Sequence, residues 1–176
     1  MINLSNFQNP EFERGVSRLK EVLWWICRGV LFGTWFPVPS GIKVAVLRWF
    51  GAQVGQGVVI RSRVNITMPW RLRIGDYVWI GDEVMILSVA EVTIGSHSCL
   101  SQRAFLCAGS HDFTKESFDL VTGSIEVGES CWVGAQAFVA PGVVMRKASQ
   151  CLAGAVVVKD VKEGQVVGGV PAKVLR

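Results

Sequence analysis

Aliphatic residues recur at every sixth position through most of this chain, and a glycine often follows them. The repeat is clear from Ile74 onwards, and a weaker copy begins at Val54. Short repeats of fixed length are typical of solenoids, in which each coil buries its apolar side only against the next coil. Three hexads per coil predict three flat faces. The repeating positions are Val54, Ile60, Ile66, Ile74, Ile80, Ile86, Ile94, Leu100, Leu106, Val127, Val133, Val139, Met145, Cys151 and Val157.

The spacing also predicts where a coil lengthens and where a loop leaves it. The steps from Ile66 to Ile74 and from Ile86 to Ile94 are each longer than a hexad, so one coil in this region runs from Ile74 to Ile94. The next step, from Gly95 to Gly128, exceeds such a coil by more than half its length. We therefore predict a loop insertion over residues 109–124. Inserted loops on repeat scaffolds often carry function.

The hexad repeat is absent from residues 1–50, where apolar residues at helical spacing predict helices instead. Residues 16–32 place Leu19, Leu23, Ile26 and Val30 at helical spacing. A second apolar segment, residues 42–50, ends before a glycine.

We interpret residues 1–50 as a capping segment over the open end of the first coil, and residues 51–176 as the β-helix domain. The alternative is peripheral membrane contact through residues 16–50, where four tryptophans lie beside Arg and Lys. Charged residues interrupt the apolar run, so no transmembrane span is predicted.

Composition narrows the range of functions. The chain has 18 Lys and Arg against 14 Asp and Glu, a net charge of +4. This excess is too small to indicate nucleic-acid binding, although it suits an anionic ligand or an acidic membrane surface. The five cysteines form no CxxC motif, so no zinc site is predicted. Their odd number and the absence of a signal-peptide pattern predict a reducing, cytoplasmic location. Cys131 and Cys151 fall at small or inward positions, where we expect them to pack.

Several motifs resemble those of the hexapeptide-repeat acyltransferases. They are GSHDF at residues 109–113, IEVGESCWVGAQAFVAPGV, LAGAVVVKDV and the C-terminal VVGGVPAKVLR. LRWFGAQVG and SQRAFLCAGSHDF are most similar to the colanic-acid-type polysaccharide O-acetyltransferases. The resemblance implies an all-β fold, a left-handed parallel β-helix with an N-terminal helical cap. It also implies a homotrimer with active sites between subunits. Acetyl-coenzyme A (acetyl-CoA) would be the acyl donor, a saccharide the acceptor, and no metal would be needed.

One histidine is a candidate general base. His111 lies in the predicted insertion, whereas His97 falls at a corner position of its hexad, where a solvated side chain is expected. Acyl transfer to a hydroxyl needs a base, and the pKa of histidine suits that role near neutral pH. On spacing alone His111 is equally a loop residue with a local hydrogen bond; the resemblance implies catalysis. A covalent alternative uses Cys107 as nucleophile, against its interpretation as a small packing residue.

The other site residues are predicted mainly by resemblance. Asp112 is expected to orient His111 or bind the acceptor, or else to act as a turn residue. Arg103 stands where many related enzymes have asparagine, and either binds an anionic acceptor or forms a surface salt bridge. The resemblance assigns coenzyme contacts to Trp132 (at the thioester end), Ala135 (through its N–H), Ala153, Gly154, Lys159 and Lys173, with Arg176 as a further phosphate contact.

The sequence thus predicts a cytoplasmic O-acetyltransferase, with an alternative location at the inner face of the membrane. Its acceptor would be a saccharide or lipid-linked glycan precursor. The alternatives are N-acetylation of an amino sugar and a non-catalytic β-helix scaffold. A carbonic anhydrase of this fold type is disfavoured, because its zinc site needs three histidines. The two histidines of this chain cannot supply three per site, even across a subunit interface, if one of them catalyses or faces solvent.

Overall fold

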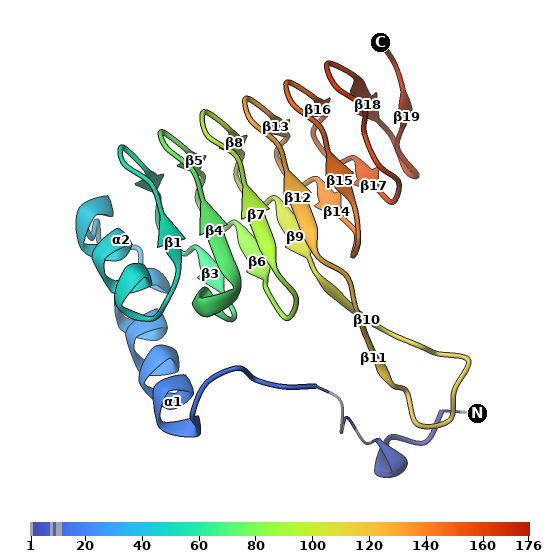
Figure 1. Cartoon of the computed structure of the whole chain (residues 1–176). Helices are drawn as coiled ribbons and strands as arrows, with labels where there is room; N and C mark the ends of the chain where they lie inside the picture. The colour runs from blue at the N-terminus through green and yellow to red at the C-terminus, as the bar shows by residue number, and fades with distance from the viewer. Residues whose placement is uncertain (1, 8, 10–11) are drawn as a thin grey trace.

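The structure is a computed structural model that describes residues 2–7, 9 and 12–176. It shows a parallel β-helix with helices at its N-terminal end (Figure 1). Residues 1, 8, 10 and 11 of the predicted capping segment lie outside the described residues. The helices are η1 (Leu4–Asn6), α1 (Arg18–Cys27), its continuation as the π-helix η2 (Arg28–Phe32), α2 (Ser40–Trp49) and the 3-10 helix η3 (Pro69–Arg71).

Three parallel sheets form the three faces of the prism. Face 1 contains β1 (Gln53–Val54), β4 (Leu72–Ile74), β7 (Val92–Ile94), β12 (Ile125–Val127) and β15 (Val144–Met145). Face 2 contains β2 (Val59–Ile60), β5 (Trp79–Ile80), β8 (Cys99–Leu100), β13 (Trp132–Val133), β16 (Gln150–Cys151) and β18 (Val166–Gly168), with β19 (Lys173–Val174) added antiparallel. Face 3 contains β3 (Asn65–Ile66), β6 (Met85–Leu87), β9 (Phe105–Cys107), β14 (Phe138–Val139) and β17 (Val156–Val157).

The register of the sheets confirms the predicted coils. Ile74 pairs with Ile94, Ile94 with Val127, and Val127 with Met145, so the longest step is the one that contains the predicted insertion. The repeating apolar positions from Ile60 to Val157 face inward and are almost entirely buried, in agreement with the prediction, and Val54 on the first coil is partly buried. Cys131 and Cys151 are each 2% exposed, so both pack in the core as expected.

The coils turn sharply at three corners, which we number by the faces they join: corner 1 joins faces 1 and 2, corner 2 joins faces 2 and 3, and corner 3 joins faces 3 and 1. The glycine of a hexad lets one coil approach the next at such a corner. At corner 2, a Cβ on Gly134 would lie 2.5 Å from the backbone nitrogen of Ala153. A side chain at this position would therefore push two coils apart.

The predicted insertion forms a hairpin at corner 3. β10 (Gly109–His111) pairs antiparallel with β11 (Leu120–Thr122), and the chain then returns to β12 on face 1. The hairpin projects below the coils in Figure 1 and leaves their stacking intact. It places His111 outside the prism and close to corner 3.

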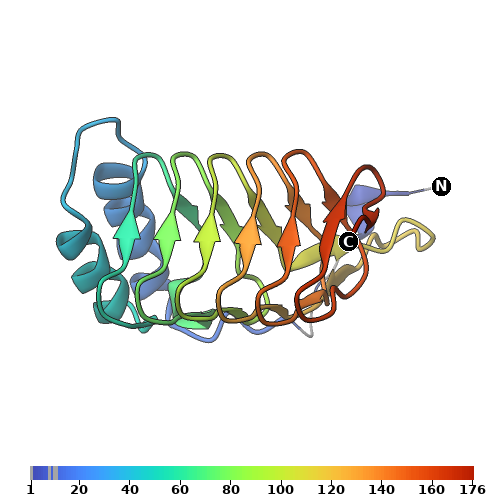
Figure 2. The ribbon, with the colours of Figure 1, turned by 90° about the horizontal axis from the view of Figure 1, so that it is seen from above.

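The N-terminal helices cover the end of the first coil, as Figure 2 shows, and side chains from them satisfy carbonyl groups of that coil. Trp24 Nε1 donates to Ile66 O on face 3 at 3.0 Å. Lys43 Nζ donates to Arg61 O, which directly follows β2 of face 2, at 2.6 Å. Arg48 completes the set with hydrogen bonds to Val54 and Gly55 on face 1. The predicted cap is therefore present, and it replaces the hydrogen bonds that a preceding coil would have made.

Helix α1 and its continuation η2 turn their apolar stripe away from the coil. The apolar residues at helical spacing point away from the coil: Leu19, Ile26 and Val30 are 70%, 59% and 66% exposed. The opposite side packs on the first coil, where Trp24 and Phe32 are fully buried. An indole there fills volume and also donates to the free carbonyl groups, which an aliphatic side chain cannot do. Within the described residues, no helix combines the length and apolar character needed to cross a membrane.

Candidate active site

His111 is held by the inserted hairpin through one ring nitrogen. Its Nδ1 lies 2.8 Å from the carbonyl oxygen of Phe118. A carbonyl oxygen only accepts hydrogen bonds, so Nδ1 carries the proton in the neutral ring, and Nε2 keeps its lone pair. A histidine in this tautomer can accept a proton at Nε2.

Two aromatic rings fix the orientation of the His111 imidazole. The Phe118 ring stacks on it at a centroid distance of 4.3 Å and an interplanar angle of 1°. Phe7 from the N-terminal segment meets it edge-on at 5.8 Å. That segment is attached to the hairpin by a hydrogen bond from Asn3 N to Glu116 O at 3.0 Å. No feature of the sequence pattern indicated either phenylalanine, because both lie outside the hexads.

Asp112 stabilises the turn of the hairpin. Its Oδ1 accepts hydrogen bonds from Thr114 N at 3.0 Å and from Thr114 Oγ1 at 2.6 Å. These two bonds lower the pKa of the Asp112 carboxyl group, so it remains ionised near neutral pH. His111 is oriented by the hydrogen bond that its Nδ1 donates to Phe118 O, and this carboxylate takes no part in it.

Cys107 is poorly suited to act as a nucleophile. Its side chain is buried, with 8% exposure, and Sγ lies 3.0 Å from Gly109 O. Burial raises the pKa of the Cys107 thiol, which keeps it protonated, whereas the attacking species must be the thiolate. The structure favours the interpretation of Cys107 as a packing residue.

Corner 2 gathers four of the predicted site residues. Ala135, Ala153 and Gly154 lie on neighbouring coils there, and Gly154 N donates to Ala135 O at 2.8 Å. Arg103 lies on the preceding coil with a positive φ of 60°. Its Nε donates to Glu83 Oε2 at 2.8 Å, so the surface salt bridge considered for it is present. A pocket of about 330 Å³ at this corner is lined by Trp35, Asp82, Glu83, Gln102, Arg103, Ala135 and Gln136.

Face 2 carries an exposed aromatic row beside corner 2. Trp132 and Trp79 both pair with Cys99, from either side, and they are 51% and 62% exposed. Trp132 Nε1 donates to Ser101 Oγ at 2.8 Å, which fixes the indole on the face. Trp79 was not predicted as a site residue. Its hexad position is equivalent to that of Trp132, so the repeat register could have indicated it.

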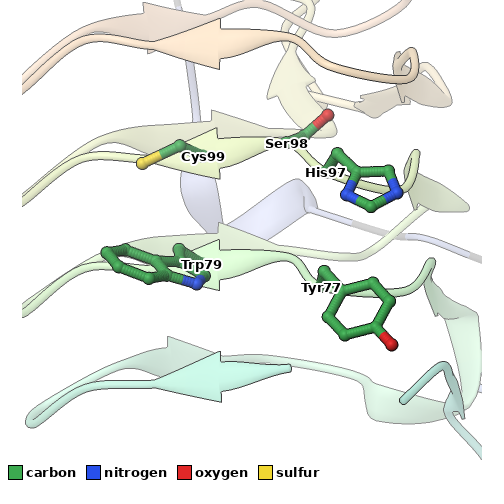
Figure 3. Close-up of a pocket in the computed structure, with 5 residues that line it drawn as sticks. All are labelled: Tyr77, Trp79, His97, Ser98 and Cys99. Carbon is green, nitrogen blue, oxygen red and sulfur yellow. The ribbon is translucent and has the colours of Figure 1, made fainter. Parts of the chain in front are cut away.

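A further pocket, of about 490 Å³, lies where corner 1 meets face 2. Tyr77 and His97 stack along the corner at 5.4 Å, while Trp79 and Cys99 lie on the adjoining strands (Figure 3). His97 is exposed at its corner, as the hexad position predicts.

The predicted site residues are therefore divided between two parts of the chain. His111 and Asp112 lie in the hairpin at corner 3, and Lys159 is exposed at the same corner, on the coil that follows β17. The predicted residues at corner 2 are separated from them by face 3, and Trp132 lies next to corner 2 on face 2. Lys173 is exposed on β19 at the C-terminal end of face 2. Among the described residues, His, Cys, Asp and Glu form no group of three or more that could hold a metal ion.

Comparisons with known proteins identify the class. No protein-family model matches the chain. A solved structure of a hexapeptide-repeat acetyltransferase from Vibrio cholerae, complexed with acetyl-CoA, superposes with a TM-score of 0.83 at 21% identity. The alignment covers 98% of this chain and 95% of that one. This likeness confirms the predicted left-handed parallel β-helix.

Curated relatives give the family. The protein assigned as colanic acid biosynthesis acetyltransferase WcaF in Escherichia coli (strain K12) is 41% identical over 177 residues, which span 100% of this chain and 97% of that protein. The galactoside O-acetyltransferase of the same organism is 26% identical over 76% of this chain and 68% of its own length. The chain belongs to the hexapeptide-repeat acetyltransferases, in the family of the colanic acid biosynthesis acetyltransferase. It is an enzyme that transfers an acyl group, as the motifs implied.

Proposed function

We propose that this enzyme transfers the acetyl group of acetyl-CoA to a hydroxyl group of a saccharide or lipid-linked glycan precursor of a surface polysaccharide. Oxygen as the acceptor atom is supported by the similarity to a galactoside O-acetyltransferase, and the glycan precursor by the relative named for colanic acid biosynthesis. The reaction takes place in the cytoplasm, at the inner face of the membrane. The observation that carries the chemistry is the hydrogen bond between His111 Nδ1 and Phe118 O.

In this mechanism His111 is the general base. Nε2 takes the proton of the acceptor hydroxyl while the oxygen attacks the carbonyl carbon of the thioester. Phe118 O holds the Nδ1 proton and stabilises the imidazolium that forms. The C–S bond then breaks, and the imidazolium returns the proton to the thiolate of coenzyme A. The transfer is direct, which agrees with the protonated state of Cys107.

The coenzyme lies along corner 2 in this proposal. Ala135 and Ala153 are small enough for a pantetheine arm to approach the backbone, and the Ala135 N–H would donate to the arm or to the developing oxyanion. The exposed Trp132 side chain lines the end of the groove that holds the thioester. Gly154 lengthens the groove. Lys173 and, from corner 3 of the neighbouring subunit, Lys159 neutralise the phosphates.

The active site then forms between two subunits of a homotrimer. His111 and the coenzyme groove lie at different corners of the same chain, with face 3 between them, so a neighbouring chain has to bring the two together. The exposed Trp79 and Trp132 on face 2 provide an apolar surface for such a contact. A closed three-fold ring would make three equivalent sites.

Arg103 and Asp112 contact the acceptor. The Asp112 carboxylate stays ionised and can accept hydrogen bonds from sugar hydroxyl groups. Arg103 is already paired with Glu83, and the two groups together offer both donors and acceptors to a polar sugar.

The proposal is tested by measuring thiol release from acetyl-CoA with a panel of saccharides, followed by mass spectrometry of the products. We expect release that depends on the acceptor, and products whose acetyl group is lost in mild alkali, as an ester requires. Acetyl groups stable to alkali would show N-acetylation instead. The proposal would be contradicted if the protein binds acetyl-CoA but releases no thiol with any of the acceptors.

A further inference from the structure

The outer side of helix α1 and of its continuation η2 carries an uninterrupted apolar stripe. It consists of Leu19, Val22, Leu23, Ile26 and Val30, which are between 40% and 70% exposed. The other side of the same helix, with Glu21 and Trp24, is buried against the rest of the molecule. The stripe thus points away from the first coil, although amphipathic helices normally turn such a stripe towards the core.

Helix α2 and the segment before it extend this apolar surface. Ile42 and Trp49, two turns apart along α2, are 49% and 70% exposed. Lys43 and Leu47 on the other side of α2 are buried towards the first coil. Phe36 in the connecting segment is 70% exposed. Both helices pack on one end of the β-helix, so their outer sides face away from it together (Figure 2).

The charges around this surface are almost all positive. Residues 12–50 contain six Lys and Arg, of which Lys43 is buried, and two acidic residues, Glu13 and Glu21. Glu21 is 7% exposed and is paired with Arg14. Arg18 is exposed on α1. Arg48 is exposed on α2 with its guanidinium group hydrogen-bonded to Val54 O and Gly55 O of the first coil, and Arg28 is half-buried beyond α1 and hydrogen-bonded to Asn65. Among the described acidic residues of this segment, only Glu13 is exposed to offset the cationic groups.

We propose that the outer side of α1 and α2 binds the surface of an anionic phospholipid bilayer, with the helices lying parallel to the membrane plane. The apolar stripe and the exposed indole rings of Trp25 and Trp49 enter the boundary between headgroups and acyl chains. The surrounding arginines contact the lipid phosphates. This inference rests on the proposed location of the enzyme at the inner face of the membrane, and it assigns the surface and the lipid chemistry.

A second copy of the chain fits this surface less well. End-to-end contact of two copies would bring two arginine-rich rims together, and like charges in contact weaken an interface. An anionic bilayer offers both the apolar layer for the stripe and the negative charge for the rim. Charge complementarity therefore selects the membrane as the occupant.

Flotation of the full-length protein with vesicles tests the proposal. We expect the protein to float with vesicles of phosphatidylcholine mixed with phosphatidylglycerol, and to bind pure phosphatidylcholine vesicles more weakly. Binding to the anionic vesicles should decrease as the salt concentration is raised, because salt screens the charges of the arginines. The combined substitutions Leu19→Gln and Ile26→Gln should lower vesicle binding by roughly tenfold or more, since two apolar side chains no longer enter the lipid. Glutamine is a good helix former, so α1 is retained.

A matched control has two exposed apolar residues replaced elsewhere, Val121→Gln and Val174→Gln, and should bind vesicles like the unchanged protein. Protein that stays unbound with anionic vesicles, or a stripe variant that floats like the unchanged protein, would overturn the proposal. The proposal would also be overturned if the unchanged protein binds no vesicles but self-associates in sedimentation experiments, and the stripe variant does not self-associate. Acetyl transfer to a water-soluble saccharide is measured in parallel, because it tests the enzyme activity independently of membrane binding.

Discussion

The Nδ1 atom of His111 lies 2.8 Å from the carbonyl oxygen of Phe118, further along the same hairpin. This contact leaves Nε2 as the basic nitrogen, so removing the imidazole should remove the general base. We expect His111→Ala to lower kcat by about 10²- to 10⁴-fold while acetyl-CoA binding persists. Steady-state kinetics and calorimetric titration of acetyl-CoA measure the two quantities. His97→Ala, at an exposed corner, is the matched control and should retain activity. Full activity in His111→Ala would remove this residue from the mechanism.

The Phe118 ring should act as a positioning group for His111. Phe118→Ala keeps the backbone carbonyl but removes the stacked ring, so the imidazole gains freedom to leave its orientation. We expect kcat to fall by roughly ten- to a hundredfold, with little change in the KM for acetyl-CoA. Phe118→Tyr retains a stacking ring and should restore most of the activity. If both variants lose activity to the same extent, the ring orients nothing and the effect lies in the fold of the hairpin.

Mixed oligomers should reveal a site shared between subunits. Ala153→Trp is expected to block the coenzyme groove at corner 2, where the side chain is exposed and a larger residue can be accommodated. His111→Ala and Ala153→Trp should each be inactive, but co-expressed chains should regain part of the activity, because some interfaces combine an intact groove with an intact histidine. Activity of differentially tagged, co-purified oligomers provides the measurement. Absence of any recovery in verified mixed oligomers would place both halves of the site on one chain.

Lys43 should make stability depend on pH in a predictable direction. It is 1% exposed, and burial lowers its pKa. Between the lowered folded pKa and the ordinary value, the unfolded chain binds more protons than the folded chain, so the free energy of unfolding rises as pH increases through this interval. Lys43→Met should lack that rise, and near neutral pH it should lose about 1 kcal/mol because two carbonyl groups lose their donor. Urea unfolding at several pH values tests this, with Lys162→Met at an exposed position as control. An unchanged pH dependence in Lys43→Met would contradict the prediction.

Gly134 should be intolerant of even one methyl group. A Cβ there would lie 2.5 Å from Ala153 N, so Gly134→Ala has to separate two coils, at a cost of roughly 1–3 kcal/mol. Gly41 in α2 has nothing within 4 Å of the corresponding position, and Gly41→Ala should be neutral or slightly stabilising. Thermal and urea unfolding compare the two variants. Equal stability of both would show that the coils have room at corner 2.

The sequence alone determined the coils, because each inward aliphatic residue can be buried only by an identical position on the next coil. The pairing of Ile74 with Ile94 and of Ile94 with Val127 follows directly from that spacing. The insertion was equally predictable, since surplus residues between two fixed rungs must leave the stack. The hexapeptide motifs identified the enzyme class, because the residues of a short motif are adjacent in the sequence and can be recognised without the fold.

Only the tertiary structure decided what non-repeating residues contact. Helical spacing identifies an apolar stripe on α1 but not the side it faces, and the free carbonyl groups of the first coil selected Trp24 rather than Leu19 for burial. Likewise, Phe118 and Phe7 meet His111 through the path of a hairpin and an N-terminal segment that follow no repeat. Periodicity constrains residues that pack on copies of themselves, whereas contacts between dissimilar segments depend on the geometry that the whole chain adopts.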